Sequence, residues 1–479
     1  MTTRRPGTPP LSAPLSAPLT NAVASLAGWA AIVLAAGGAT RMQSSTPAVL
    51  QPVAGVPMVR LVCDLLRDAG CARISVVAGE PRDAIARAAG VGVDIVRAPH
   101  EGGAAGAARA AREAVGEHGN VLVLRADMPL LSTRTLRELA GRHLAASNVL
   151  TFLTAYVEEP AGYSRILRRN GKVQGIVDER DLTAAMRGQP EVNAGLYAAD
   201  AQWLWDTLAA IEADGGDTDV DADGDSALGE LVARAVERGG VDAYQATESV
   251  EVQQVADRLQ QARADRVMRD RIRDRLLREG VSLIDPPTIY VDASVEVDPD
   301  TTLLPGTHLQ GNTRIARGCQ IGPNAVLVDM QVGEDCVIGG STLEGSTLAD
   351  GVTVGPYCHV RAEAILEQGV HLGNYAEVKA SRLGARTTVG HFSYIGDAEV
   401  GSDVNVGAGS ITANYDGSSK HRTVIGDGVL LGSDTVMVAP VTLGPGAKTG
   451  AGAVVVDDVP AGALVIGVPA RVRRAPEGG

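Results

Sequence analysis

The chain has 479 residues, and its 57 acidic side chains outnumber 43 Lys and Arg, which gives a net charge of −14. This length exceeds a single hydrophobic core, so we expect two or three domains, and the acidic balance argues against a nucleic-acid binder. The five cysteines include no CxxC pair and no apolar run approaches 18 residues, which favours a cytoplasmic protein without disulfides or a membrane span.

Residues 1–29 are expected to form a disordered, Pro-rich tail. They contain the tandem sequence PLSAPLSA and two adjacent arginines, Arg4 and Arg5. Twin arginines before apolar sequence can mark an export signal. Here the strongest apolar stretch, WAAIVLAA, also serves as the strand that leads into a Gly-rich turn. Cleavage there would destroy the first domain, so we interpret the segment as a tail.

Residues 30–250 are predicted to form a Rossmann-like α/β domain with a mostly parallel sheet. Short aliphatic segments alternate with helical ones, which is typical of strands joined by crossover helices. The expected strands are 31–37, 73–79, 93–98 and 120–127, and the expected helices are 57–70 and 106–119. Ligands of such sheets bind at the carboxyl ends of the strands. A Gly-rich turn at 36–39, of the kind that cradles phosphates, and Asp127 both fall there.

Two charged segments follow. The sequence DVDADGDSALGE, Asp219 to Glu230, has the spacing of a calcium-binding loop. Ser226 stands where that loop carries an aliphatic residue, so we favour a solvated acidic loop over a calcium site. Residues 251–281 are dense in Arg and Asp at helical spacing, which predicts a linker helix with a solvated face.

From residue 282 to 479, aliphatic residues recur every six positions. The first series is Val291, Val297, Leu303, Leu309, Ile315, Ile321 and Leu327, and the period resumes at Val354 and again at Ile425. A left-handed parallel β-helix requires this spacing, because each coil has three flat faces and one aliphatic side chain per face points inward. Such a core needs few aromatic side chains, which agrees with an aromatic content of only 3%.

Five motifs in this region carry a resemblance to a known family. They are VRAEA, GNYAEVKASRLG, VGHFSYIGDAEVG, VNVGAGSITANYDGSSKHRT and IGDGVLLGSDTVMVAPV. With them, residues 31–470 resemble the bacterial bifunctional N-acetylglucosamine-1-phosphate uridyltransferase / glucosamine-1-phosphate acetyltransferase family. The resemblance implies a nucleotidyltransferase domain, a linker helix and a β-helix. It also implies a homotrimer with acetyltransferase sites between subunits, and small-molecule substrates on the route to UDP-N-acetylglucosamine.

The resemblance assigns residues to the acetyltransferase site. His391 in VGHFSY corresponds to the general base, a role that suits an imidazole because its pKa lies near neutral pH. The residues that correspond to sugar-phosphate contacts are Arg361, Lys379, Tyr394 and Asn405. Those that correspond to acetyl-CoA contacts are Ala408, Asn414, Tyr415, Lys420, Ser433 and Ala451.

The N-terminal half matches the family less completely. The residues that correspond to its nucleotide site are Leu34, Ala35, Ala36, Gly37, Arg41, Asp127, Asp178 and Asn193, with Asp127 as the Mg²⁺ ligand. Ala48 stands in place of a phosphate-contacting lysine, Arg97 in place of a base-reading glutamine, and Ala256 in place of a second metal ligand. Nucleotidyl transfer depends on neutralising the phosphate charge. We therefore expect an acetyltransferase whose uridylyltransferase site is impaired.

Two alternatives remain open. The chain could retain both reactions and make UDP-N-acetylglucosamine from UTP with Mg²⁺. It could instead acetylate another amino-sugar phosphate, with the N-terminal domain serving as a binding module. Neither alternative requires a nucleic-acid or membrane partner.

Overall fold

The computed structural model describes residues 25–37, 41–99, 103–214 and 225–474. They form two compact units. The first unit contains the described residues up to Gly37 and Val62–Val252. The second unit contains the described residues of 38–61 and those from Gln253 onward. No helix in these ranges is both long enough and apolar enough to cross a membrane.

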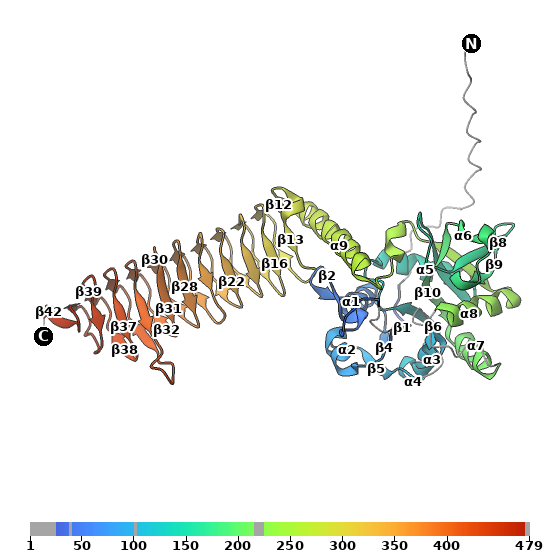
Figure 1. Ribbon diagram of the computed structural model, residues 1–479, viewed down its shortest axis with the longest axis horizontal. Helices are drawn as coiled ribbons and strands as arrows, with labels where there is room; N and C mark the ends of the chain where they lie inside the picture. Colours follow the sequence, from blue (N-terminus) through green and yellow to red (C-terminus); the bar gives the residue numbers. More distant parts are fainter. Residues whose placement is uncertain (1–24, 38–40, 100–102, 215–224, 475–479) are drawn as a thin grey trace, which may run out of the picture. The chain divides into compact units, whose positions relative to one another are not determined.

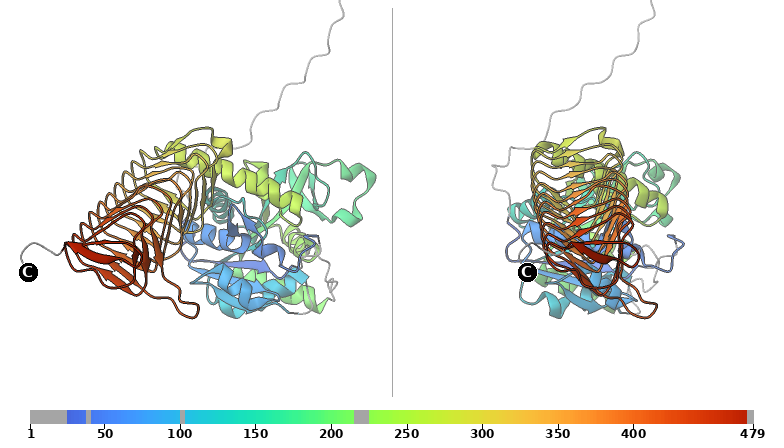
Figure 2. Two further views of the ribbon diagram at one scale, coloured as in Figure 1. Left: turned by 60° about the vertical axis from the view of Figure 1, so that its left-hand side comes forward. Right: turned by 90° about the vertical axis from the view of Figure 1, so that its left-hand side faces the viewer.

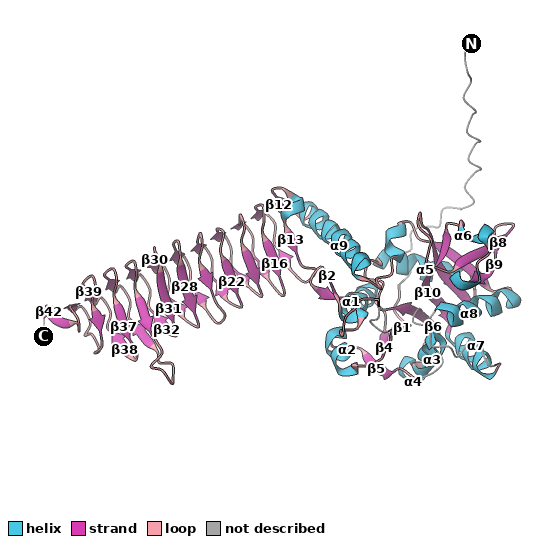
Figure 3. Ribbon diagram, in the orientation of Figure 1, coloured by secondary structure: helices cyan, strands magenta, loops and turns pink. Residues whose placement is uncertain are grey.

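A nine-stranded mixed sheet forms the core of the first unit (Figure 3). Its main order is β11-β7-β10-β6-β1-β4-β5, with β8 and β9 attached beside β10. The strands are β1 (Trp29–Ala35), β4 (Arg73–Ala78), β5 (Asp94–Arg97), β6 (Asn120–Arg125), β7 (Leu150–Tyr156), β8 (Arg165–Arg169), β9 (Lys172–Val177), β10 (Glu191–Asp200) and β11 (Val241–Gln245). The four predicted strands are confirmed as β1, β4, β5 and β6, which run parallel, whereas β10 is antiparallel to both β6 and β7.

The helices follow the predicted alternation. They are α1 (Met58–Ala69), α2 (Arg82–Ala89), α3 (Gly103–Ala110), α4 (Arg112–Val115), α5 (Thr133–Ala146), α6 (Ala184–Arg187), α7 (Ala201–Ala213) and α8 (Asp225–Arg238). The expected helix 106–119 is instead two helices, α3 and α4, which meet at Ala111. Gly116 ends α4 with φ 68°, in the left-handed region that glycine adopts without strain.

The folded part of the chain begins before residue 30. Leu26 is fully buried, and Trp29 opens β1 with its ring edge-on to His143, at a centroid distance of 5.7 Å. These residues therefore belong to the domain core and not to the expected tail, whose residues 1–24 lie outside the described ranges.

In the second unit, a short hairpin packs on the linker helix. The hairpin comprises β2 (Pro52–Val53) and β3 (Val56–Pro57), and the helix is α9 (Arg258–Arg278). The backbone N–H of Ala54 donates to Asp265 of α9 at 2.7 Å. The helix begins later than the expected residue 251, because 249–252 form a 3₁₀ turn and the carboxylate of Asp257 caps the first helical turn.

The rest of the second unit is a left-handed parallel β-helix of stacked coils (Figure 2). Three sheets form its faces, and up to β40 each strand pairs in parallel with the third strand along the chain. The twelve-stranded sheet contains β12 (Ser282–Leu283), β15 (Thr302–Leu303), β18 (Gln320–Ile321), β21 (Val337–Ile338), β24 (Thr353–Val354), β27 (His371–Leu372), β30 (Thr388–Val389), β33 (Asn405–Val406), β36 (Leu430–Leu431), β39 (Lys448–Thr449), β41 (Leu464–Ile466) and the antiparallel β42 (Arg471–Arg474).

Two further sheets complete the prism. The ten-stranded sheet contains β13 (Tyr290–Val291), β16 (His308–Gln310), β19 (Val326–Val328), β22 (Thr342–Glu344), β25 (His359–Val360), β28 (Ala376–Lys379), β31 (Ser393–Gly396), β34 (Ile411–Ala413), β37 (Val436–Val438) and β40 (Val454–Val455). The nine-stranded sheet contains β14 (Glu296–Val297), β17 (Arg314–Ile315), β20 (Gln331–Val332), β23 (Thr347–Leu348), β26 (Ile365–Leu366), β29 (Arg382–Leu383), β32 (Ala398–Val400), β35 (Thr423–Ile425) and β38 (Val441–Leu443).

The six-residue period is confirmed as the core of this β-helix. Every predicted inward residue from Val291 to Leu327 is at most 8% exposed. One coil is lengthened, because Asn405 pairs with Leu430, whereas Thr388 pairs with Asn405 after a coil of ordinary length. The extra residues leave the stack between β34 and β35 (Figure 1).

Candidate active site

Three cationic side chains gather on the outer face of the ten-stranded sheet. Lys379 of β28 pairs in register with Gly396 of β31, and the N–H of Arg361 donates to the Val378 carbonyl at 2.8 Å, which sets Arg361 beside Lys379. The ammonium of Lys420 lies next to Lys379 and lowers the pKa of Lys379. We call Arg361, Lys379 and Lys420 the cation cluster. It brings three positive charges together on a chain whose net charge is −14.

The inserted loop that carries Lys420 is braced internally. Asp416 accepts hydrogen bonds from the backbone N–H groups of Ser418 and Ser419, each at 2.8 Å, and from His421 Nε2 at 2.6 Å. The bonds from Ser419, His421 and Ser418 lower the pKa of Asp416. Tyr415 and Lys420 face each other as an antiparallel bridge. The loop is therefore a stiff hairpin, which reduces the entropy lost when a ligand binds.

A polar network joins this loop to the sheet. The amide of Asn414 donates to the Asp397 carboxylate and approaches the Tyr394 hydroxyl at 3.4 Å. The Tyr394 ring lies against Gly396, where a Cβ atom would fall only 2.3 Å from the tyrosine oxygen. Asp397 was not singled out from the sequence, although it stands within the motif YIGDAEV. Its charge balances Lys379 and Lys420.

Arg361 has an anionic neighbour that sequence reasoning also missed. Its Nη1 lies 3.0 Å from Glu377 Oε1, and both side chains are about two-fifths exposed. Glu377 is two residues before Lys379 on the same outward face of β28, so the alternation of the strand could have identified it.

His391 lies at a corner of the prism, between the twelve-stranded and ten-stranded sheets. The turns that follow β30, β33, β36 and β39 stack there through hydrogen bonds such as Asp434 N–H to Ala408 O at 2.6 Å and Gly452 N–H to Ser433 O at 2.8 Å. The strand register gives one shared turn position to His391, Ala408, Ser433 and Ala451. We call these four residues the corner column. His391 is exposed and does not point into the packed interior.

Asn405 does not join the cation cluster within one chain. It is exposed on β33 of the twelve-stranded sheet, whereas the cluster lies on the ten-stranded sheet. Across the described part of the chain, no hydrogen bond or ion pair links Asn405 to these residues. The predicted sugar contacts are thus divided between two faces of one prism.

In the N-terminal unit, the Gly-rich turn follows β1. Leu34 and Ala35 end the strand, and Ala36 and Gly37 are exposed. Arg41 is exposed on a turn in the segment that belongs to the second unit, and Ala48 is buried. Residues 38–40 of the turn lie outside the described ranges, as do 219–224 of the segment predicted to be a solvated acidic loop.

Asp127 follows β6 and is held by an arginine. Arg125 Nε lies 3.0 Å from Asp127 Oδ1, and Arg125 Nη2 lies 2.7 Å from Oδ2. The two side chains are only 17% and 10% exposed. Sequence reasoning identified the carboxylate but not its partner, although Arg125 is two positions earlier in LRAD.

The two remaining predicted residues of this half are also engaged within the protein. Asp178 caps a 3₁₀ turn (Glu179–Asp181) and accepts from the N–H of Arg180 at 3.0 Å. Asn193 is fully buried in β10, and its amide donates to the Tyr197 hydroxyl at 2.7 Å. Next to them, the buried Arg165 pairs with Glu179 at 3.0 Å.

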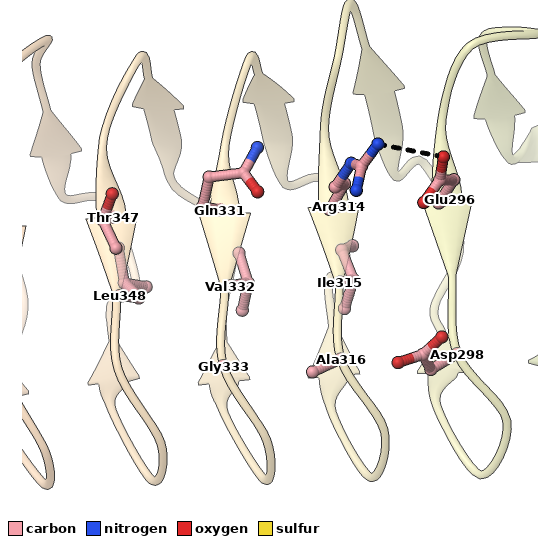
Figure 4. A pocket seen from close by; sticks show the side chains of 10 residues that line it. All are labelled: Glu296, Asp298, Arg314, Ile315, Ala316, Gln331, Val332, Gly333, Thr347 and Leu348. Atoms are coloured by element: carbon pink, nitrogen blue, oxygen red, sulfur yellow. Dashed lines mark ion pairs between the residues drawn. The ribbon is translucent and has the colours of Figure 1, made fainter.

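A shallow groove crosses the nine-stranded sheet of the β-helix, near the start of the β-helix (Figure 4). Its outer rim carries Glu296, Arg314, Gln331 and Thr347, and Arg314 pairs with Glu296 at 3.3 Å. None of the ten lining residues is a histidine or cysteine that could serve as a nucleophile or base near neutral pH. In the described part of the chain, no cluster of three or more His, Cys, Asp and Glu could hold a metal ion.

Comparisons with known proteins cover both halves of the chain. The family model of the MobA-like NTP transferase domain matches residues 31–216. A protein of Rubrobacter xylanophilus named Bifunctional protein GlmU is 42% identical over 445 residues, which is 93% of this chain and 94% of the relative. Proteins of the same name from Pelobacter propionicus and Heliobacterium modesticaldum are each 40% identical, cover 93% and 91% of this chain, and are themselves covered over 97% and 94% of their length.

Proposed function

This chain belongs to the bifunctional GlmU family of enzymes, and we propose that it acetylates the amine of glucosamine 1-phosphate with acetyl-CoA, using His391 as the general base. The product would be N-acetylglucosamine 1-phosphate, on the route to UDP-N-acetylglucosamine. The observation that carries the proposal is that the exposed His391 just precedes β31, the strand whose Gly396 pairs with Lys379 of the cation cluster.

The chemistry asks three things of the protein. The phosphate must be held, and three cations suit a dianion, since charge-assisted hydrogen bonds are the stronger ones. The amine must lose a proton as its nitrogen attacks the thioester carbon, and His391 would accept that proton. The C–S bond then breaks, CoA leaves, and the imidazolium can return a proton to the departing sulfur.

The corner column supports a binding role for acetyl-CoA. Ala408 and Ala451 have the smallest side chain other than hydrogen, and Ser433 is little larger, so these side chains would not obstruct a molecule that lies along the turns from His391. Tyr415 and Asn414 on the inserted hairpin would flank the bound molecule. A thioester lying on this path would bring its carbonyl carbon toward the imidazole.

We further propose that the complete site forms between chains of a homotrimer. The support is the division of the predicted sugar contacts, because Asn405 and the cation cluster lie on different sheets of one prism. A second β-helix packed alongside would bring the Asn405 of one chain toward the cluster of another. Sedimentation of the purified protein measures this directly, and a monomer with full activity would contradict it.

For the N-terminal half we propose impaired uridylyl transfer. The side chains of Ala48 and Ala256 have no charged or metal-binding atoms, and Asp178 and Asn193 are bonded within the protein. A fully bifunctional enzyme is the second candidate. It is favoured by alignments that extend over both halves of relatives named bifunctional.

The test is release of CoA from acetyl-CoA and glucosamine 1-phosphate by the wild type and by His391→Ala. A general base typically contributes about 10²–10⁴ in rate, so the variant should lose a factor in this range. His308→Ala is the matched control, because His308 is a histidine of β16 in the same β-helix, and its ring stacks on Tyr290 outside the site. A wild type that releases no CoA, or a His391→Ala variant that stays active, would reject the proposal.

A further inference from the structure

The pair formed by Arg125 and Asp127 occupies the edge of the sheet where a metal would be expected. Arg125 ends β6 and pairs in register with Leu34 of β1, and the N–H of Ala126 donates to the Leu34 carbonyl at 2.9 Å. Both strands are parallel there, so Arg125 and Asp127 stand at the carboxyl end of the sheet beside the start of the Gly-rich turn.

The geometry of the pair is that of a strong, shielded interaction. Two different guanidinium nitrogens approach the two different carboxylate oxygens, at 3.0 and 2.7 Å. With side chains only 17% and 10% exposed, little water competes for either group. Arginine stays charged at every pH at which proteins fold, so the guanidinium remains a cation beside this carboxylate.

These residues do not fit a resident Mg²⁺. The ion needs close oxygen ligands in near-octahedral geometry and usually takes one or two protein carboxylates. At Asp127 both oxygens already face a cation that would repel a second one. The position that corresponds to the family's other ligand is Ala256, which has no side-chain oxygen.

We propose that Arg125 takes the place of the divalent cation in the N-terminal half, so that Asp127 does not bind metal in this chain. The inference deepens the impairment proposed above by giving it a physical cause. It also predicts that the carboxylate is intact but masked. Removing one guanidinium should therefore create a metal site.

Mn²⁺ is a suitable probe, because its free concentration can be followed by electron paramagnetic resonance in titrations of the full-length protein. The wild type and Asp127→Asn should bind equal numbers of Mn²⁺ ions. Arg125→Ala should bind one more ion per chain than the wild type, and Arg125→Ala/Asp127→Asn should lose that ion. Mn²⁺ should also raise the melting temperature of Arg125→Ala by several degrees more than that of the wild type.

Arg73→Ala is the matched control, because it breaks an Arg–Asp pair with Asp94 at 2.8 Å whose side chains are 45% and 43% exposed. It should gain no Mn²⁺ site. Arg125→Gln retains hydrogen-bonding groups without the charge and replaces the alanine variant if that one fails to fold. The proposal is overturned if the wild type binds one ion that Asp127→Asn loses, or if neither Arg125 variant gains one. Pyrophosphate release, which tests the proposed impairment of uridylyl transfer, is not part of this readout, so the failure of one proposal is distinguishable from failure of the other.

Discussion

Replacing Gly396 by alanine tests whether the position of the Tyr394 ring matters for sugar binding. A Cβ atom at Gly396 would lie 2.3 Å from the tyrosine oxygen, 2.5 Å from Cζ and 2.8 Å from Cε1. Carbon atoms in good contact are about 3.5–4.0 Å apart, so the ring must move by about 1 Å. The hydroxyl would then leave the neighbourhood of Asn414.

We expect Gly396→Ala to lower kcat/KM for glucosamine 1-phosphate by up to about 10²-fold, since a misplacement of 1 Å in a site can cost this much. Overpacking should cost about 1–3 kcal/mol of folding stability, at the lower end because the ring is half-buried and can yield outward. The assay is CoA release at varied sugar concentration, with urea unfolding measured alongside.

Two further single variants help to interpret this result. Tyr394→Ala should lose a similar factor, and the double variant should lose little more, because both changes remove the same contact. Gly339→Ala is the matched control in the β-helix, since its Cβ would meet only atoms at 3.6–3.7 Å. Wild-type kcat/KM in Gly396→Ala would refute the idea that the ring position matters.

The remaining predictions concern charge. Lys379→Met and Lys420→Met should each raise KM for the sugar phosphate roughly 10-fold. The control Arg382→Met breaks exposed pairs with Glu367 and Glu399 and should leave KM unchanged. Equal KM values in all three variants would contradict a role of the two lysines in binding phosphate. Lys420 lowers the pKa of Lys379, so in Lys420→Met the alkaline limb of a 1/KM profile should shift to higher pH. Burial lowers the pKa of His143 to about 4, below its value near 6.5 in the unfolded chain. The free energy of unfolding should therefore be highest above pH 6.5 and should fall by up to about 3 kcal/mol as the pH drops toward 4. Urea unfolding of His143→Gln should not show this fall.

Much of the architecture could be predicted from the sequence, because the fold itself requires the spacing at which aliphatic residues recur. A prism with one inward aliphatic side chain per face imposes a six-residue repeat, so the sequence alone predicts that Leu309, Ile321 and Leu327 point inside. The period resumes at Ile425, and the structure places the extra residues before it outside the stack, between β34 and β35. The start of α9 was less predictable, because Asp and Arg are equally compatible with a helix and with the capped turn before it.

The side-chain partners of the site residues could not be predicted from such spacing. A motif marks Lys379 or Asp127, but a side chain's neighbour depends on three-dimensional register. Glu377 reaches Arg361, which precedes it by 16 positions and lies in the previous coil. Arg125 bonds to Asp127 only because the chain turns at Ala126 after the strand ends. Such pairings decide whether a charge is available to a ligand.

The most direct test of the account runs both half-reactions separately on one preparation of the full-length protein. We predict steady CoA release from acetyl-CoA and glucosamine 1-phosphate, and no pyrophosphate release above background from UTP and N-acetylglucosamine 1-phosphate with Mg²⁺. Pyrophosphate release at a rate comparable to that of CoA would contradict the proposed impairment. An absence of CoA release would contradict the assignment of the β-helix as the working half.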